Sequence, residues 1–307
     1  MSTPALSVVI PVFNEADSLP ELYERLTATL EGLGRPYEII AVDDGSSDGS
    51  LDILTGLRKN DERLRVAPMV RNFGQSPALY AGVSLARGEY VFIMDADLQV
   101  FPEDLPRLVE KLDEGYDCVS GWRAHRRDHF ARRIVSQALN WYIARVTRVP
   151  LHDYGCTLKG FRREVVERMV SLDHRCRYLP VDLVAIAGNI AEVEVRHSER
   201  KQGNSKYGVF KLVRTAVDLI TSITDAPLRM VGAAGAIFAF GGFAMFVRVL
   251  WYRLAYGNVL QMESVIAIFF LFGGIQLLAT GTLCAYVGRI YIEVQRKPYF
   301  LLRDEVE

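Results

Sequence analysis

The sequence predicts an α/β domain built on a mostly parallel sheet, followed by a smaller membrane-associated part. Two features of the 307-residue chain lead to this prediction. Over the first two thirds, short β-branched runs alternate with segments of helical periodicity, which is typical of a parallel sheet with helices on both faces. Over the last third, long uncharged apolar runs replace this alternation, which indicates membrane-spanning helices.

The strands and helices are expected in a regular order. Residues 6–12 form a buried strand, and residues 15–34 form a helix that ends near Gly34. Further strands are expected in YEIIAVDD, LRVAPMV, EYVFIMDAD and YDCVSGW, and further helices in RNFGQSPALYAGVSLARG and EDLPRLVEKLDEG. Because no basic leader precedes the first strand, we interpret it as part of a cytoplasmic domain and not as a signal peptide.

Polar residues follow three of the expected strands at the point where each strand ends. These groups are Asn14–Glu15, Asp43–Asp44 and Asp95–Asp97. Ligands of open parallel sheets bind at the carboxyl ends of the strands, so the three groups are expected to meet at one edge. The alternative is that each group is only a solvated turn. Convergence from three strands favours a binding site.

The residue types at this edge suit a nucleotide diphosphate and a divalent metal. Asp95 and Asp97 place two carboxylates beside one turn, and such hard oxygen ligands suit Mg²⁺ or Mn²⁺. Asp43 offers a carboxylate to a base or a ribose hydroxyl, Gly45 allows close approach of the backbone, and Glu15 either caps a helix or holds a nucleotide. The chain lacks the GxxxxGK[ST] and GxGxxG patterns, which disfavours P-loop NTPases and dinucleotide oxidoreductases.

The last third of the chain predicts a membrane hairpin. An amphipathic stretch at 208–226 is expected to lie in the membrane interface, with a core-packed helix as the alternative. Charge-free runs at about 230–250 and 264–288, within residues 227–290, are expected to span the bilayer. Basic residues after the second run place the N-terminal domain at 1–207 and the tail at 291–307 in the cytoplasm.

Six ordered motifs resemble the family-two glycosyltransferases that act on polyprenyl phosphates. They are VVIPVFNE, VDDGSSDGS, RNFGQSPALYAG, MDADLQ, DYGCTLKGFRREVV and RKQGNSKYG. The resemblance covers nearly the whole chain and extends to dolichol-phosphate mannose synthase and the undecaprenyl-phosphate glucosyltransferases. Through DYGC and the H-x-E-R-x-x-G-x-SKY pattern, the chain is most similar to the undecaprenyl-phosphate 4-deoxy-4-formamido-arabinose transferases.

This resemblance implies an A-type glycosyltransferase fold, Rossmann-like, for the catalytic domain at 1–207. It implies an inverting, metal-dependent transfer of a sugar from a nucleotide-sugar, expected to be a UDP-sugar, to a polyprenyl phosphate. The lipid-linked monosaccharide would serve cell-envelope glycans or lipid A modification. The implied location is the bacterial inner membrane, with both termini in the cytoplasm.

The resemblance also implies roles for individual residues, and the sets overlap. The implied catalytic residues are Asp97, Asp153 and Arg200, with Asp153 either a base or a group that positions the sugar. The implied metal ligands are Asp95, Asp97 and Gln99. The implied donor-binding residues are Pro11, Phe13, Glu15, Asp43, Asp44, Gly74, Gln75, Asp95, Arg200 and Lys206. Relatives often carry a polar residue and a proline where this chain has Val100 and Phe101, so the conformation of the metal loop stays open.

The acceptor phosphate calls for cations more than for a strong base. Its second ionisation lies at about pH 6, so it is already largely an anion at neutral pH. Arg132 and Ser136 are four residues apart and share a face if this segment is helical. The resemblance assigns both, together with Arg123, to the acceptor phosphate. The alternative is a solvated basic helix, or one that rests on anionic lipid.

The expected partners are a nucleotide-sugar, a polyprenyl phosphate, the lipid bilayer and further copies of the chain. Glycines in the spans allow close helix packing, and the resemblance implies a homo-oligomer, a tetramer. The formal net charge of −1 disfavours a nucleic-acid partner. A processive polysaccharide synthase is disfavoured because no Q-x-x-R-W pattern occurs, and a non-catalytic nucleotide-sugar-binding membrane protein would have little use for the D-x-D pair.

Overall fold

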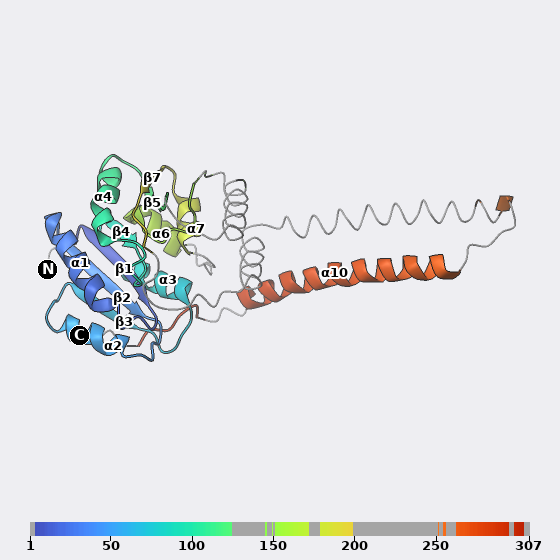
Figure 1. Ribbon diagram of the computed structural model, residues 1–307, viewed down its shortest axis with the longest axis horizontal. Coiled ribbons are helices and arrows are strands. Elements are labelled where there is room, and N and C mark those ends of the chain that lie inside the picture. Colours follow the sequence, from blue (N-terminus) through green and yellow to red (C-terminus); the bar gives the residue numbers. More distant parts are fainter. Residues whose placement is uncertain are drawn as a thin grey trace. The chain divides into compact units, whose positions relative to one another are not determined.

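The computed structural model divides the chain into two compact units. One unit comprises Met1–Leu219 and Pro298–Glu307, and the other comprises Ile220–Lys297. Figure 1 labels the helices and strands that lie in the described ranges. The structure describes residues 4–124, 145, 149, 151–171, 179–198, 251, 254–255, 262–294 and 298–303.

The first part of the larger unit alternates strands and helices. Its elements in chain order are β1 (Leu6–Val12), α1 (Leu19–Gly32), β2 (Tyr37–Asp43), α2 (Ser50–Arg58), β3 (Leu64–Pro68), α3 (Gln75–Leu85) and β4 (Tyr90–Ile93). α1 begins at Leu19, later than predicted, because residues 14–16 instead bond to the turn after β2. α2 was not among the expected helices. It is only nine residues long and contains Gly56, although Leu51, Leu54 and Leu57 recur at helical spacing.

The second part of this unit departs from strict alternation. Its elements are the 3₁₀ turn η1 (Pro102–Asp104), α4 (Leu105–Asp113), β5 (Cys118–Trp122), β6 (Lys159–Arg162), α6 (Arg163–Ser171), α7 (Leu179–Ile186) and β7 (Ile190–Glu194). β6 and β7 were not among the expected strands. They have four and five residues and the sequences KGFR and IAEVE, which mix polar with apolar residues, so neither carries a strong apolar pattern.

The sheet is mostly parallel, as predicted, and has one antiparallel insertion. Its strand order is β3-β2-β1-β4-β6-β5-β7. β1 is parallel to β2 and β4, β2 to β3, and β5 to β7, whereas β6 is antiparallel to β4 and β5. The carboxyl ends of β1, β2 and β4 therefore meet at one edge, which is where ligands of such sheets bind.

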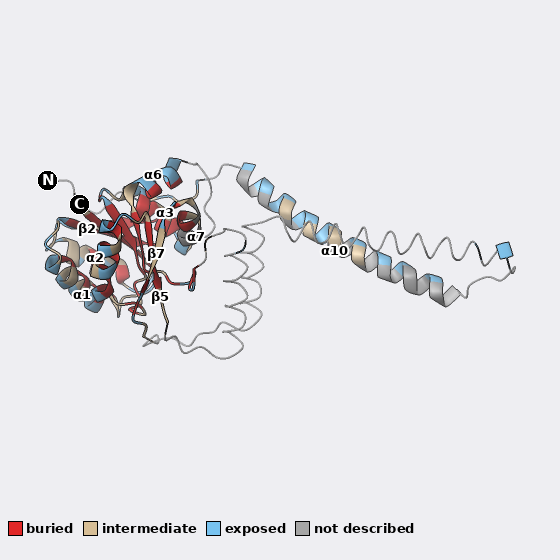
Figure 2. Ribbon diagram, turned by 90° about the horizontal axis from the view of Figure 1, so that it is seen from above, coloured by how far each residue is buried: buried red, intermediate tan, exposed pale blue. Residues whose placement is uncertain are grey.

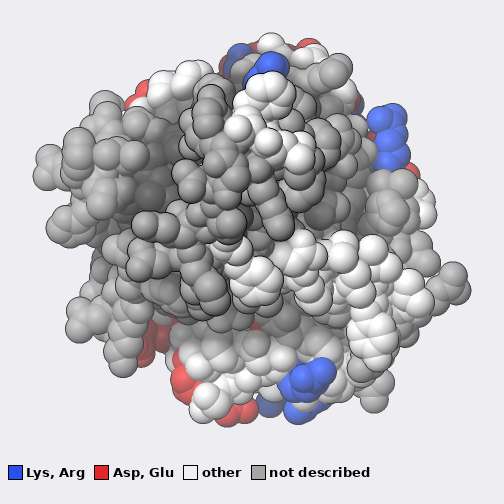
Figure 3. All heavy atoms as spheres, turned by 90° about the vertical axis from the view of Figure 1, so that its right-hand side faces the viewer, with Lys and Arg blue, Asp and Glu red and all other residues white. Residues whose placement is uncertain are grey.

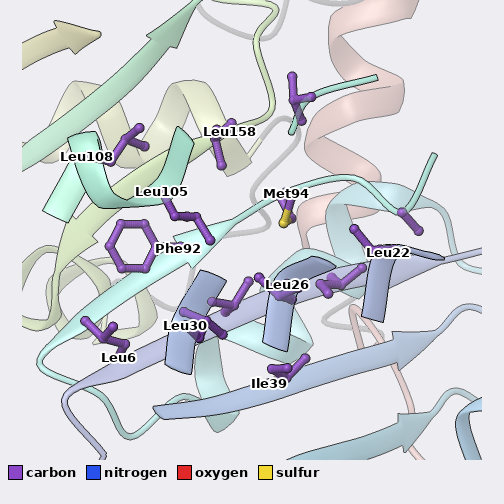
Figure 4. Close-up of a cluster of buried hydrophobic side chains, with 14 of the residues drawn as sticks. Leu6, Leu22, Leu26, Leu30, Ile39, Phe92, Met94, Leu105, Leu108 and Leu158 are labelled. Carbon is purple, nitrogen blue, oxygen red and sulfur yellow. The ribbon is translucent and has the colours of Figure 1, made fainter. Parts of the chain in front are cut away.

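Helices cover both faces of this sheet and bury it (Figure 2). On one face, leucines at helical spacing on α1 and α4 pack against alternate residues of β1, β2 and β4 in a single apolar cluster (Figure 4). On the other face α3 lies very close, since a Cβ at Gly82 would stand 2.2 Å from Cγ1 of Val9. Burial on both faces explains why the central strands read as continuous apolar runs.

Ion pairs fasten the outer elements of the unit to one another. The guanidinium of Arg35, before β2, donates to both carboxylate oxygens of Asp113 at the end of α4. Such exposed pairs contribute little to stability individually.

In Figure 3, the acidic and basic side chains that are visible and described lie in separate small groups, with both signs of charge present.

The smaller unit is described through α10 (Met262–Val294), which contains the predicted 264–288 segment. Within the described ranges, no helix is at once long enough and apolar enough to cross a bilayer. The predicted interfacial helix at 208–226 lies outside the described residues, as does the whole of the predicted span at 230–250. The membrane hairpin therefore stays a prediction.

Candidate active site

The predicted convergence of polar residues at the carboxyl edge is confirmed. In the parallel register, Val12 of β1 pairs with Asp43 of β2, and Val9 pairs with Ile93 of β4. The turns that leave these three strands are therefore neighbours. They bring residues 13–16, 43–50 and 95–99 to one edge of the sheet.

The turn after β2 contains two buried aspartates with different partners. Asp44 accepts the backbone N–H of Phe73 at 2.7 Å and that of Gly74 at 2.8 Å, one on each carboxylate oxygen. Burial raises the pKa of the Asp44 carboxyl above its ordinary value, and these two bonds counteract the shift. Asp44 thus anchors the loop before α3. Gly45 has φ 72° and a Cβ there would stand 2.7 Å from the Asn72 nitrogen, so this close approach requires glycine.

Asp43 is the residue of this turn whose carboxylate is only partly satisfied by the described residues. Its side chain is 2% exposed, and Oδ2 accepts the N–H of Ser46 at 3.2 Å. Oδ1 is buried and accepts no hydrogen bond from the described part of the chain. A buried carboxylate oxygen without a partner is costly, and a donor group of a ligand would relieve that cost.

The turn after β1 is fastened to the turn after β2. Asn14 has φ 56°, donates its N–H to Ser46 and accepts the Ser47 N–H on its side-chain oxygen at 2.8 Å. Of the predicted donor-binding residues here, Pro11 lies within β1 and Phe13 exposes 47% of its surface. The ring of Phe13 is therefore available at the edge.

The turn after β4 holds the D-x-D pair. Asp95 accepts a hydrogen bond from Nε2 of Gln75 at 2.7 Å, which links this turn to the start of α3. Asp97 accepts the N–H of Gln99 at 3.1 Å, and Leu98 between them has φ 57°. Burial, and then the negative charge of Asp97, raise the pKa of the Asp95 carboxyl to about 6.

The D-x-D pair fits a divalent cation in part. The two carboxylates are close enough for their charges to repel, as the raised pKa of Asp95 indicates, and a cation between them would relieve that repulsion. In the described ranges, no group of three or more His, Cys, Asp or Glu side chains is placed to hold a metal. Any further oxygen ligands would therefore come from Gln99, from water or from the phosphates of a bound nucleotide.

Two residues that the sequence placed in separate roles form one ion pair. Arg123 donates from Nε to Oδ2 of Asp153 at 2.7 Å and from Nη2 to Oδ1 at 3.0 Å. Their side chains are 9% and 12% exposed, and Oδ1 also accepts the Gly155 N–H. Hydrogen bonds from Thr157 and Gln75, and then the positive charge of Arg123, act against the raised pKa of Asp95, so the ion pair lies near the D-x-D turn. Sequence reasoning missed Thr157, which carries no distinctive pattern.

The unusual QVFPE loop is held firmly. Val100 is buried and forms an antiparallel bridge with His197, and the Ser198 N–H donates to the Gln99 carbonyl at 3.0 Å. Two guanidinium groups lie over the Phe101 ring. The Cζ atom of Arg25 is 4.8 Å and that of Arg196 is 5.4 Å from the ring centroid.

Acidic side chains hold both guanidiniums in place. Glu103 binds Arg25 through two hydrogen bonds of 2.8 and 2.9 Å, and Asp104 accepts from Nε of Arg196 at 3.1 Å. Val100 and Phe101 therefore both take part in the contacts that hold this loop.

A buried lysine lies on the sheet behind the ion pair. Lys159 of β6 is fully buried and donates to the Ser120 hydroxyl of β5 at 2.5 Å. Burial lowers the pKa of its ammonium group, while the thiols Cys156 and Cys118 and the carboxylate of Asp153 raise it. In the sequence, Lys159 is one lysine in the short stretch KGFR, and this pattern does not predict that it is buried.

Several predicted site residues lie outside the described residues. They are Arg132, Ser136, Arg200 and Lys206. The structure does bring Asp43, Asp44, Gly74, Gln75, Asp95, Asp97, Gln99, Arg123 and Asp153 to one region of the fold.

Comparisons with known proteins agree with this arrangement. Residues 7–170 match the family described as glycosyl transferase family 2. The undecaprenyl-phosphate 4-deoxy-4-formamido-L-arabinose transferase of Serratia proteamaculans is 41% identical over 98% of this chain and 94% of its own length. The protein of the same description from Yersinia enterocolitica is 40% identical over 98% of this chain and 93% of its own length.

A solved structure shares the fold. The glucosyl-3-phosphoglycerate synthase of Mycobacterium tuberculosis, in complex with phosphoglyceric acid, superposes with a TM-score of 0.50 at 20% identity. The alignment covers 71% of this chain and 79% of that protein. At this identity the likeness concerns the fold of the catalytic domain alone.

Proposed function

The chain belongs to glycosyl transferase family 2, and we propose that it transfers a sugar from a nucleotide-sugar to undecaprenyl phosphate. The observation that carries this proposal is the identity of 40–41% to two transferases described as acting on that acceptor, over 98% of the chain. The carboxyl edge of the sheet supports it, because Asp43, Asp95 and Asp97 are the residue types that a nucleotide diphosphate and a metal require there.

The donor would lie across the turns after β1, β2 and β4. Its base or ribose would donate to Oδ1 of Asp43, which accepts no hydrogen bond from the residues that the structure describes, beside the exposed ring of Phe13. Asp44 and Gly74 would hold the loop that closes this side, and Gln75 would orient Asp95. A UDP-sugar is the donor we propose, with a 4-deoxy-4-formamido-arabinosyl group as the first candidate from the relatives' description.

The charges of the diphosphate require compensation during the transfer. Mg²⁺ or Mn²⁺, held by Asp95, Asp97 and Gln99, would supply positive charge that stabilises the departing nucleoside diphosphate. Arg200 and Lys206 would add to this compensation from the segment that follows Ser198. The acceptor phosphate is an anion at neutral pH, and Arg132 and Ser136 would position it for an inverting attack.

Asp153 has a defined geometry in this scheme. Two hydrogen bonds from Arg123 and one from the Gly155 N–H hold its carboxylate beside the D-x-D turn. A carboxylate held in this way is suited to orienting a sugar hydroxyl. Arg123 would act on the acceptor phosphate from the same place, so the ion pair would connect the two substrates.

The membrane part of the proposal rests on the sequence. The acceptor is a lipid, and the charge-free run at 264–288, with the run at 230–250, would anchor the catalytic domain to the cytoplasmic face of the inner membrane. The interfacial helix at 208–226 would bring the catalytic domain to the lipid headgroups. Glycines in both runs would allow a homo-oligomer, and we propose a tetramer.

A donor screen tests the proposal. The full chain in detergent is mixed with undecaprenyl phosphate, Mg²⁺ or Mn²⁺ and a panel of UDP- and GDP-sugars, and lipid-linked product is measured by mass spectrometry. We expect a metal-dependent product from one donor, and its loss in Asp97→Asn. Glu62→Gln is the matched control, because Glu62 is an exposed carboxylate just before β3, at the amino end of the parallel strands and so at the opposite edge of the sheet.

The two alternative functions give different results in the same screen. Nucleotide binding without product from any donor would favour a binding protein without turnover. Product that grows beyond one sugar per lipid would favour a polysaccharide synthase. Either result would overturn the proposed single transfer.

A further inference from the structure

Residues 299–303 lie along the edge of the catalytic sheet and pair with the chain just after β3 through one antiparallel bridge. The Val70 N–H donates to the Leu301 carbonyl at 3.0 Å, and the Arg303 N–H donates to the Pro68 carbonyl at 2.7 Å. Between these bonds, Met69 and Leu302 form an antiparallel bridge. β3 is the first strand in the sheet order, so this segment pairs with the chain where β3 ends.

Aromatic side chains hold the same segment against α3. The Tyr299 ring meets the Tyr80 ring edge-on at 5.7 Å, and the Phe300 ring lies 6.0 Å from it at a tilted angle. Such aromatic pairs contribute about 0.5–1.5 kcal/mol beyond the area that they bury. The segment is therefore fixed by backbone and side-chain contacts together. In sequence it follows the end of α10 after four residues.

The other side of this pairing leads directly to the donor site. The Met69 N–H donates to the Asp43 carbonyl at 2.8 Å, so residues 68–70 lie between the C-terminal segment and Asp43. The chain then continues into Phe73 and Gly74, whose N–H groups bind Asp44.

The C-terminal segment, residues 68–70 and the turn after β2 thus form adjacent rows. Residues 68–70 pair with the turn after β2 on one side. On their other side, the C-terminal segment is the only pairing partner among the described residues.

We propose that residues 299–303 are a positioning strand for the donor site. By pairing with residues 68–70, they hold the loop that binds Asp44 and the backbone that binds Asp43, and so preorganise the pocket for the nucleotide. This inference rests on the proposed function. It assigns the C-terminal tail a role in donor binding. This role is separate from the chemical step at the D-x-D turn.

The proposal requires a stronger effect on donor binding than on the chemical step. If residues 299–303 no longer pair with residues 68–70, residues 68–74 can adopt other conformations. Ordering them when the donor binds then costs free energy, and the affinity for the donor falls. The donor KM and the Kd for UDP would rise together, while kcat at saturating donor would change little.

The test compares two substitutions at one position of the full chain. Arg303→Pro removes the N–H that binds Pro68 and places a ring against that carbonyl, whereas Arg303→Ala removes only the side chain. We expect the donor KM and the UDP Kd of Arg303→Pro to exceed those of Arg303→Ala by about tenfold, the size expected for a disrupted short pairing. Equal KM and Kd values in the two variants would overturn the proposal.

A second measurement needs no variant and separates this inference from the proposed function. Hydrogen exchange of the wild-type chain is followed with and without saturating UDP. We expect UDP to slow exchange in peptides that cover residues 68–74 and 299–303 together, because coupling between two sites is reciprocal. Slowing at 68–74 alone would overturn the positioning strand.

A wild-type chain that binds neither UDP nor GDP would contradict the proposed function. In that case exchange of residues 68–74 in Arg303→Pro against Arg303→Ala still decides the positioning strand. Faster exchange by about tenfold in the proline variant supports it, and equal exchange overturns it.

Discussion

Phe101 offers a sharp test of how the loop after the D-x-D turn is held. We consider Phe101→Leu, which keeps an apolar side chain of similar size but removes the aromatic face. Arg25 and Arg196 lie over that face at 4.8 and 5.4 Å. The leucine variant therefore loses two cation–π contacts and little of the apolar packing.

The expected loss follows from the exposure of the two guanidinium side chains. The Arg25 side chain is 26% exposed and is held by Glu103, so its contact is worth about 1 kcal/mol. The Arg196 side chain is 59% exposed, so its contact is worth about 0.5 kcal/mol. Together these stabilise the closed loop by about 1–2 kcal/mol, which corresponds to a factor of about 5–30 in the equilibrium for local opening.

Hydrogen exchange of the full chain measures this opening. In peptides that cover residues 97–104, we expect Phe101→Leu to exchange about 5–30 times faster than wild type. Arg25→Met combined with Phe101→Leu completes a double-mutant cycle, which isolates the contact from the Arg25–Glu103 ion pair. Exchange within about twofold of wild type in the leucine variant, or a coupling energy below about 0.3 kcal/mol, would refute the cation–π explanation.

Three further substitutions probe the edge of the sheet. Asp44→Asn keeps the shape of the side chain, but one of the two backbone N–H donors then faces the amide NH₂ group instead of an oxygen. The free energy of unfolding, measured by chemical denaturation, should fall by about 1–3 kcal/mol. No loss would mean that other contacts hold the loop before α3. Lys159→Met should instead raise that free energy at pH 7 by about 1–3 kcal/mol, because the lysine is buried and its pKa is lowered. The lysine's cost is fully present below its folded-state pKa and is relieved as the pH rises through that pKa towards 10.5, so the two proteins should converge at high pH, and a constant difference would contradict this. Arg123→Lys keeps the charge but loses the two-pronged bond to Asp153, so turnover should fall at least about tenfold while nucleotide binding persists, and unchanged turnover would exclude a role for this geometry.

The sequence predicted the sheet well where burial is uniform. Each of β1, β2 and β4 is covered on both faces, so its apolar run is visible without knowledge of the fold. The same logic placed Asp43 and Asp95 at one edge, because parallel strands share their direction. It missed β6 and β7, whose short segments depend on pairing with β4 and β5.

The sequence by itself determined the family, the strand–helix alternation and the residue types at the carboxyl edge, because these follow from local periodicity and ordered motifs. Only the tertiary structure decided which polar groups satisfy one another. Three contacts illustrate this: the ion pair of Arg123 with Asp153, the stacking of two arginines on Phe101, and the hydrogen bond from Arg303 to Pro68. Each of them joins residues that are at least 30 positions apart in the sequence. Such contacts depend on where the folded backbone passes, and no local pattern of residues records that path.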